Sequence, residues 1–152
     1  MNSTGPNSMR VLPPNTGAWN FQAWASWVLA FMILTRGIYL VQINPWVRGF
    51  LMMACLFTIG TTFTLSKTVR DNTSGRPDNP AWIFAVWALF VISVIATFTG
   101  IYWFPVQGWP QGFFLAAFLF QINTTFVLAK TTRDNYEAGL ILGPLQPPPT
   151  NE

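Results

Sequence analysis

Four stretches of the chain are almost entirely apolar, and short polar segments separate them. They run from about Trp19 to Val41, Trp46 to Leu65, Trp82 to Phe104 and Gln111 to Leu128. A helix of about 20 residues covers the roughly 30 Å hydrocarbon thickness of a bilayer. The stretches carry Leu, Ala and Met and lack the strict alternation of barrel strands, so helices are expected. The pattern therefore predicts an all-α membrane protein with four transmembrane helices.

The chain also contains an internal duplication with an offset of 63 residues. At that offset KTVRDN at 67–72 falls on KTTRDN at 130–135, and upstream Trp19 falls on Trp82. Over 46–72 the two copies share 16 identities without a gap. Each copy therefore consists of one helical hairpin that ends in KTxRDN.

Proline and polar residues mark the connections between the predicted helices. Pro45 and Pro110 stand where the second and fourth helices should begin, since proline loses nothing at the first helical position. A longer polar connection runs from Ser66 to Pro80. The predicted organisation is a polar tail at 1–17, a two-helix repeat at 18–73, a linker at 74–80, a second repeat at 81–137 and a Pro-rich tail at 138–152.

Each repeat contains two spans, so both should insert in the same orientation, related by a pseudo-two-fold axis along the membrane normal. Basic residues favour the cytoplasmic side of a membrane. Only Arg36 and Arg48 lie on the side of the two short turns. The termini and the linker are therefore predicted to be cytoplasmic, because their side carries Arg10, Lys67, Arg70, Arg76, Lys130 and Arg133.

Composition excludes several kinds of chemistry. Charged residues make up 9% of the chain, against about 25% in a typical soluble domain, and none lies between Asp78 and Lys130. The chain has no His and a single Cys, Cys55. Cys/His zinc sites, His-ligated haem, Ser-His-Asp catalysis and an intrachain disulfide are thus ruled out. We expect no enzyme activity, no cofactor, no metal and no nucleic-acid partner.

The duplicated hairpin resembles a known family. Each copy opens its second helix with Gly-Phe, at 49–50 and 112–113, and closes with K-T-x-R-D. This arrangement resembles the YiaA/YiaB two-helix domain, here in two tandem copies over about residues 18–137. The resemblance implies a multi-pass protein of the bacterial inner membrane and brings no biochemical activity with it.

The KTxRD motifs supply the first group of candidate site residues. Cations near a helix C-terminus complement its dipole and reach the lipid headgroups, and a docking surface for anionic lipid or a partner subunit is the alternative. If the second and fourth helices pack centrally, Arg70 should approach Asp134, and Arg133 should approach Asp71. The competing geometry pairs residues four apart within one helix. The candidates are Lys67, Arg70, Asp71, Lys130, Arg133 and Asp134.

Polar residues inside the spans form the second group. Thr58 and Gly60 correspond to Gln121 and Asn123 in the other repeat. Hydrogen bonds between helices, worth about 0.6–2 kcal/mol each, are the simplest interpretation, and a polar transport path is the alternative. The spans contain no Asp, Glu or His, which argues against proton- or cation-coupled transport. The candidates are Thr61, Thr62, Gln121, Asn123, Thr124 and Thr125.

Arg36 and Arg48 complete the candidates. Arg36 is expected to reach outward to the headgroups, with Arg48 close by at the same interface. A buried role, in which Arg36 pairs with a ligand phosphate or a partner's carboxylate, is the alternative, because no acidic residue of the chain lies on that side. Taken together, the features predict a structural or accessory subunit of a membrane complex, with lipid and other membrane subunits or further copies as partners. The alternative is a small oligomeric transporter or channel.

Overall fold

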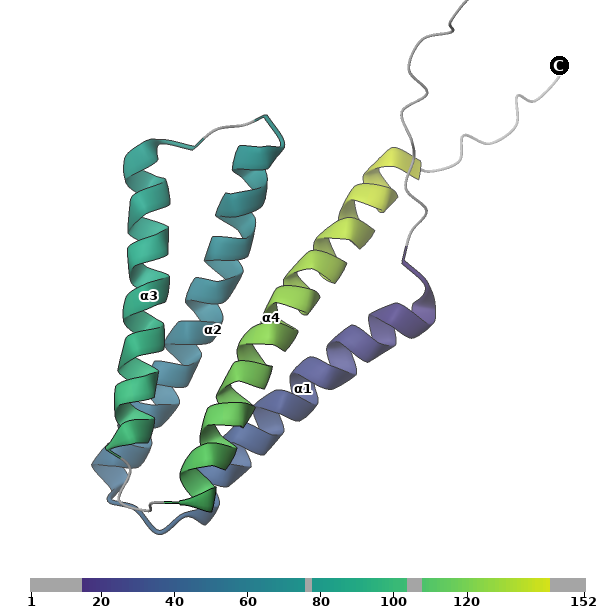
Figure 1. The fold of residues 1–152 in the computed structure, drawn as a ribbon. Coiled ribbons are helices and arrows are strands. Elements are labelled where there is room, and N and C mark those ends of the chain that lie inside the picture. Colours follow the sequence, from purple (N-terminus) through teal and green to yellow (C-terminus); the bar gives the residue numbers. More distant parts are fainter. Residues whose placement is uncertain (1–14, 76–77, 104–107, 143–152) are drawn as a thin grey trace, which may run out of the picture.

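The structure, a computed structural model, describes residues 15–75, 78–103 and 108–142. They form α1 (Gly17–Leu40), α2 (Pro45–Thr73), α3 (Pro80–Tyr102) and α4 (Trp109–Leu142), and this part of the chain contains no strand (Figure 1). All four helices are long and apolar enough to cross a membrane. The predicted fold class, four transmembrane helices in two tandem repeats, is confirmed.

Three helices begin at a side chain that caps the first turn. Thr16 accepts a hydrogen bond from the backbone N–H of Trp19 at 3.3 Å. Asn44 and Asn79 each cap a helix whose first residue is proline, and each accepts from the N–H two residues on at 3.0 Å. These caps satisfy orphan donors of the first turn, and proline there has no N–H to lose. The sequence Asn-Pro therefore defines both starts.

The second and fourth helices are longer than their apolar stretches. α2 continues through KTVRDN to Thr73, so the expectation of a connection from Ser66 is wrong. α4 continues through KTTRDN to Leu142, past residue 138, where the tail was expected to begin. Both helices continue because one side of each still packs inside the protein beyond the apolar stretch. The buried residues there are Thr68 in α2 and Thr131 and Ala138 in α4. Residues 1–14 and 143–152 of the two expected tails lie outside the described residues.

Helices of one repeat pack mainly on helices of the other. α1 packs along α4, α3 packs along α2, and α2 and α4 pack against each other in the centre. The two helices within each hairpin, α1 with α2 and α3 with α4, are antiparallel but make far fewer contacts. Figure 1 shows the pairs α2–α3 and α4–α1 lying side by side. The expected central contact between the second and fourth helices is confirmed. Each hairpin therefore completes its packing only with the other repeat.

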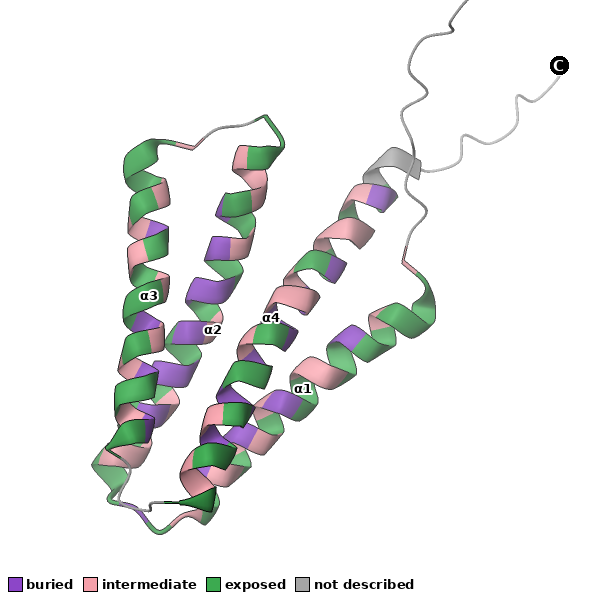
Figure 2. Ribbon diagram, viewed as in Figure 1, coloured by how far each residue is buried: buried purple, intermediate pink, exposed green. Residues whose placement is uncertain are grey.

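The buried positions reproduce the duplication residue by residue. In α1 and α3 every buried residue has a buried counterpart 63 positions away: Ala23, Ala30, Leu34 and Ile38 in the first repeat, Val86, Ser93, Thr97 and Ile101 in the second. The same offset relates all eight buried residues of α2 to buried residues of α4. Figure 2 shows these buried positions along the facing sides of the helices, with exposed residues on the outside. The two repeats thus share one packing scheme.

The bundle is tightest at the end that carries the two short turns. All four helices contribute there to an apolar cluster that includes Ile38, Leu51, Ile101 and Phe114. A Cβ on Gly100 would lie 2.8 Å from Leu51 Cδ2, and one on its counterpart Gly37 would lie 3.0 Å from a ring carbon of Phe114. From this end α2 and α4 separate toward the end with the termini (Figure 1). Because these two equivalent glycines have no side chain, α3 can lie close to α2 at Gly100, and α1 can lie close to α4 at Gly37.

Candidate functional site

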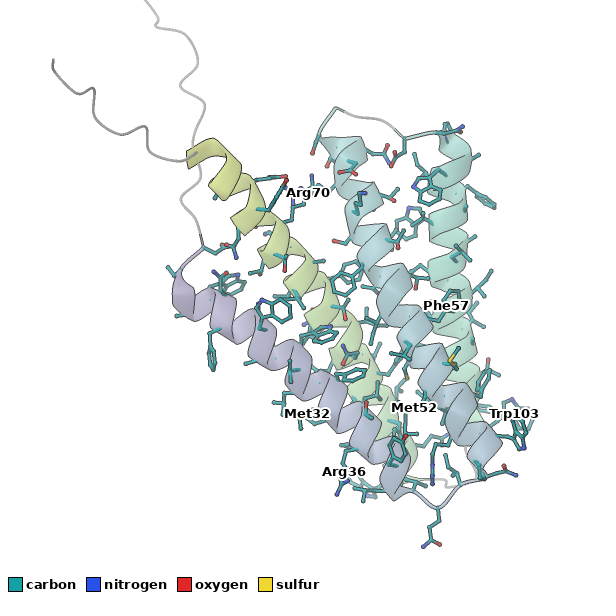
Figure 3. The ribbon with its side chains drawn as sticks, turned by 180° about the vertical axis from the view of Figure 1, so that it is seen from behind. Met32, Arg36, Met52, Phe57, Arg70 and Trp103 are labelled. Carbon is teal, nitrogen blue, oxygen red and sulfur yellow. The ribbon has the colours of Figure 1, made fainter. Side chains whose placement is uncertain are left out.

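Ion pairs between the repeats connect the separated ends of α2 and α4. Arg70 Nη1 lies 3.5 Å from Asp134 Oδ1, and Arg133 Nη1 lies 3.2 Å from Asp71 Oδ1. Arg70 extends from α2 toward α4 (Figure 3). The predicted reciprocal pairing is confirmed. The competing pairs, Lys67 with Asp71 and Lys130 with Asp134, do not form, because neither lysine has an ion pair with any described residue.

Glu137 is a third carboxylate of this cluster, and the repeat comparison did not single it out. It accepts from Arg133 Nε at 2.9 Å, one helical turn away, and also pairs with Arg70. The residue that corresponds to Glu137 in the first repeat is Ser74, so comparison of the two repeats did not mark Glu137 as a candidate. The i,i+4 spacing from Arg133 was the available signal, but only if α4 continues past the motif. All four pairs are partly exposed, so each contributes about 0–1 kcal/mol.

A hollow of about 880 Å³ lies next to this cluster, where α2 and α4 separate. Phe63, Lys67 and Arg70 line it from α2, and their counterparts 63 positions on line it from α4. Trp24 of α1 forms a further part of the wall. These three pairs of equivalent residues from the two repeats therefore face the same hollow. Its remaining lining residues are Ser66, Leu128, Ala129, Thr132, Asp134 and Tyr136.

A second, smaller hollow of about 520 Å³ lies on the other side of Lys67. It is lined by α2 and by the start of α3, including Thr68, Asp71, Asp78 and Trp82. Lys67 therefore has carboxylates in its surroundings on this side, although none is within 4 Å. Lys130 lines only the larger of these two hollows. The two lysines, equivalent by sequence, thus differ in electrostatic surroundings.

Buried hydroxyl groups join α2 to α3. Thr58 Oγ1 lies 3.2 Å from Thr97 Oγ1, and Thr61 Oγ1 lies 2.9 Å from Ser93 Oγ. Thr62 instead donates to the carbonyl of Thr58 within its own helix. Ser93 and Thr97 were not among the predicted polar candidates, since their counterparts in the first repeat are apolar Ala30 and Leu34. The self-comparison could not identify these partners.

The α1–α4 pair uses tryptophan donors in place of these hydroxyls. Trp27 Nε1 donates to Thr125 Oγ1 at 3.1 Å, and Trp19 Nε1 donates to Thr131 Oγ1 at 3.0 Å. Gln121 donates to Thr125 at 3.3 Å. Thr124, also buried, donates to the Gln121 carbonyl. Most intramembrane candidates therefore serve helix packing, with Trp19 and Trp27 as donors that the sequence did not single out.

Asn123 differs from the other polar residues of the spans. It lies on the exposed side of α4 and makes no hydrogen bond to any described residue. The expectation that it bonds between helices of the chain is therefore wrong. Two residues on from the buried Gln121, it is rotated by about 200° around the helix axis and so faces outward. Gly60, its counterpart in α2, is also exposed.

The arginines of the turn end are separate from the ion-pair cluster. Arg36 is exposed near the end of α1 (Figure 3). Arg48 is half-buried, donates to the carbonyl of Val41 at 3.2 Å, and lies over the Tyr39 ring with its guanidinium carbon 5.5 Å from the ring centroid. No described acidic residue pairs with either arginine. Arg48 therefore helps to fix the turn, whereas Arg36 is free to reach the membrane surface.

Together these features define a multi-pass membrane protein built from two tandem helical hairpins. The chain belongs to the YiaA/YiaB family: the model described as "yiaA/B two helix domain" matches it twice, at residues 19–71 and 82–134. No curated protein and no solved structure matches the chain. The resemblance noted from the repeated K-T-x-R-D motif is therefore confirmed over most of the sequence.

Proposed function

We propose that this protein is a non-catalytic structural or accessory subunit of a larger complex in the bacterial inner membrane, with both termini in the cytoplasm. The observation that carries the proposal is the amide of Asn123 on the outer side of α4, which bonds to no residue that the structure describes. An amide on a lipid-facing surface lacks the partners that water would supply. A polar contact from another membrane subunit would supply them.

The depth of Asn123 supports this argument. Trp109 begins α4 at the turn end, 14 residues earlier, which corresponds to about 21 Å along the helix. Lys130 at the opposite end follows seven residues later, or about 10 Å along the helix. Asn123 therefore falls within the hydrocarbon region. Polar side chains at such depth usually face protein or a water-filled cavity, because a group without a partner is costly there.

The surface around Asn123 suits a neighbouring helix. Gly112 and Ala116 are also exposed on α4, and helical geometry places both within about 40° of Asn123 around the axis. Small residues let two helix backbones approach closely in a membrane, where side-chain amides then bond across the interface. Exposed Leu119 and Phe120 lie between these small residues and Asn123. The face therefore allows a close approach near the turn end and offers an amide donor and acceptor about 10–16 Å further along the helix.

The transporter alternative has weaker support. The buried hydroxyls described above bond to neighbouring helices or to their own backbone. Neither hollow is lined by Thr58, Thr61, Gln121 or Thr125. Among the described residues there is no group of three or more potential metal ligands. These observations favour a packing role for the polar positions.

Purification from native membranes in a mild detergent, followed by native mass measurement, tests the proposal. We expect a stoichiometric complex with a second polypeptide, which Asn123→Leu dissociates. Thr64→Leu is the matched control, since Thr64 is also exposed on a span but already bonds to its own helix at Gly60. A solitary protomer from the unaltered chain would overturn the proposal. An assembly of identical chains alone would favour the oligomeric transporter.

A further inference from the structure

We infer that the 880 Å³ hollow is a binding site for an anionic phospholipid from the leaflet at the KTxRD end. In this arrangement the lipid phosphate lies between the ammonium groups of Lys67 and Lys130. The acyl chains lie against Phe63, Phe126 and Trp24. Three features of the hollow support this assignment: its free cations, its apolar walls and its depth.

The two lysines that line the hollow, unlike its two arginines, have no carboxylate partner among the described residues. Arg70 and Arg133 are already neutralised by three carboxylates, and the two lysines carry no ion pair to a described residue. The two lysines, the two arginines and the three carboxylates of the ion pairs together carry a net charge of +1. Basic pockets between transmembrane helices on the cytoplasmic side are suited to anionic headgroups. The lysines are therefore the groups available to a phosphate.

The walls of the hollow require a ligand with an apolar part. Phe63 and Phe126 are equivalent by the duplication, and both line it together with Leu128 and the exposed Trp24. A soluble anion would leave these surfaces without contacts. The volume falls within the range of about 300–1,000 Å³ that is usual for small-molecule sites. Charge at one end and apolar surface at the other match a phospholipid.

Depth identifies the source of the ligand. Phe126 precedes Lys130 by one helical turn, about 6 Å along α4, so the aromatic wall lies just inside the level of the lysines. Lysines at the end of a membrane span reach the headgroup layer. A lipid of the same leaflet therefore has its phosphate and its chains at the required levels without leaving the bilayer.

The two lysines are not equivalent as ligands. Asp71 and Asp134 follow Lys67 and Lys130 by four residues, so this carboxylate is common to both lysines. Lys67 also borders the smaller hollow, which Asp78 lines as well, whereas Lys130 borders only the larger one. A further carboxylate near a cation reduces the attraction of that cation for a phosphate. Lys130 is therefore expected to contribute more to lipid affinity than Lys67.

Native mass spectrometry of the detergent-purified full chain, titrated with phosphatidylglycerol, tests the inference. Phosphatidylcholine with the same acyl chains and soluble glycerol phosphate serve as comparison ligands. We expect Lys130→Gln to weaken phosphatidylglycerol binding about five- to tenfold, in line with the loss of one cation near an anionic headgroup. Arg36→Gln removes the same charge at the other end of the protein and should leave affinity within about twofold of the unaltered chain.

A second variant tests the apolar wall. Phe63→Ala removes a partly exposed ring and should weaken binding of long-chain phosphatidylglycerol without affecting a short-chain analogue. Equal affinity for phosphatidylglycerol and phosphatidylcholine would overturn the inference. Equal effects of Lys130→Gln and Arg36→Gln would do so as well. Tight binding of glycerol phosphate would replace the lipid site with a site for a soluble anion.

Discussion

Arg133 of the second repeat pairs with Asp71 of the first at 3.2 Å, and the duplication reproduces this contact with the partners exchanged, Arg70 with Asp134 at 3.5 Å. The pairs join the two central helices at the end where they separate. Their partial exposure limits the energy of each, so they act mainly on the register of α2 against α4. This reciprocity explains why the motif repeats an acid as well as two bases.

A double-mutant cycle on Asp71→Asn and Arg133→Gln should give a coupling energy of about 0–1 kcal/mol, because the pair is only half-buried. The free energy of unfolding in detergent is the quantity to measure. The same cycle on Asp71→Asn and Lys67→Gln should give a smaller coupling energy, since the charged groups of these residues are more than 4 Å apart. Stronger coupling within the helix than between the repeats would reverse the assignment.

Gly100→Ala should destabilise the protein by about 1–3 kcal/mol, because the new Cβ would lie 2.8 Å from Leu51 in the tightly packed end. Thermal unfolding of the purified protein measures the effect. Gly60→Ala is the control, since no atom lies within 4 Å of a Cβ built there. Equal melting temperatures for the two variants would contradict the close approach at Gly100.

Thr97→Val keeps the side-chain shape but removes the hydroxyl that faces Thr58 across the α2–α3 contact. We expect a loss of about 0.6–2 kcal/mol in the free energy of unfolding. Thr64→Val on the exposed side should cost less, because Thr64 bonds only within its own helix. If the two variants lose the same free energy, the buried contact between helices is not a stabilising one.

Packing between the repeats predicts that the two halves of the chain depend on each other. Residues 1–75 and 76–152, expressed together as separate chains, should associate in the membrane and copurify. Each half alone should be degraded or aggregate, because α1 and α3 find their main packing partners only in the other repeat. A stable isolated half with resolved helical packing would contradict the exchange of partners.

Reporter fusions test the orientation in the membrane. A fusion at Gly75 should report the cytoplasm and one at Gly108 the periplasm, because the chain places most basic residues on the side of the former. Signals from the same compartment would exclude an odd number of spans between the two sites.

Hydrophobic pattern and self-comparison predicted the helices, the repeats and the contact of Arg70 with Asp134. These features follow from residues that recur at the same offset. Ser93, Trp27 and Glu137 were missed, because their counterparts are Ala30, Phe90 and Ser74 and no repeat signal marks them. The partner of α1 also lay beyond prediction, since an apolar helix shows its buried face only weakly when lipid covers the rest.

Asn123 shows a different limit of the sequence. Its alignment with Gly60 and its place among polar residues favoured an interior position, but Asn123 faces outward. The sequence did not show that the rotation between residues 121 and 123 leaves only one of two nearby amides inside the bundle. The outward amide became visible only once the packing of α4 was known.

The most direct test of the proposed role is site-specific photocrosslinking in native membranes. A photoreactive residue replaces Asn123 on α4 or, as a control, exposed Ile92 on α3. We expect one discrete protein adduct from position 123, with a polypeptide other than this chain, and none of comparable yield from position 92. Adducts only with lipid at position 123, or the same protein adducts from both positions, would contradict a specific subunit contact at this face.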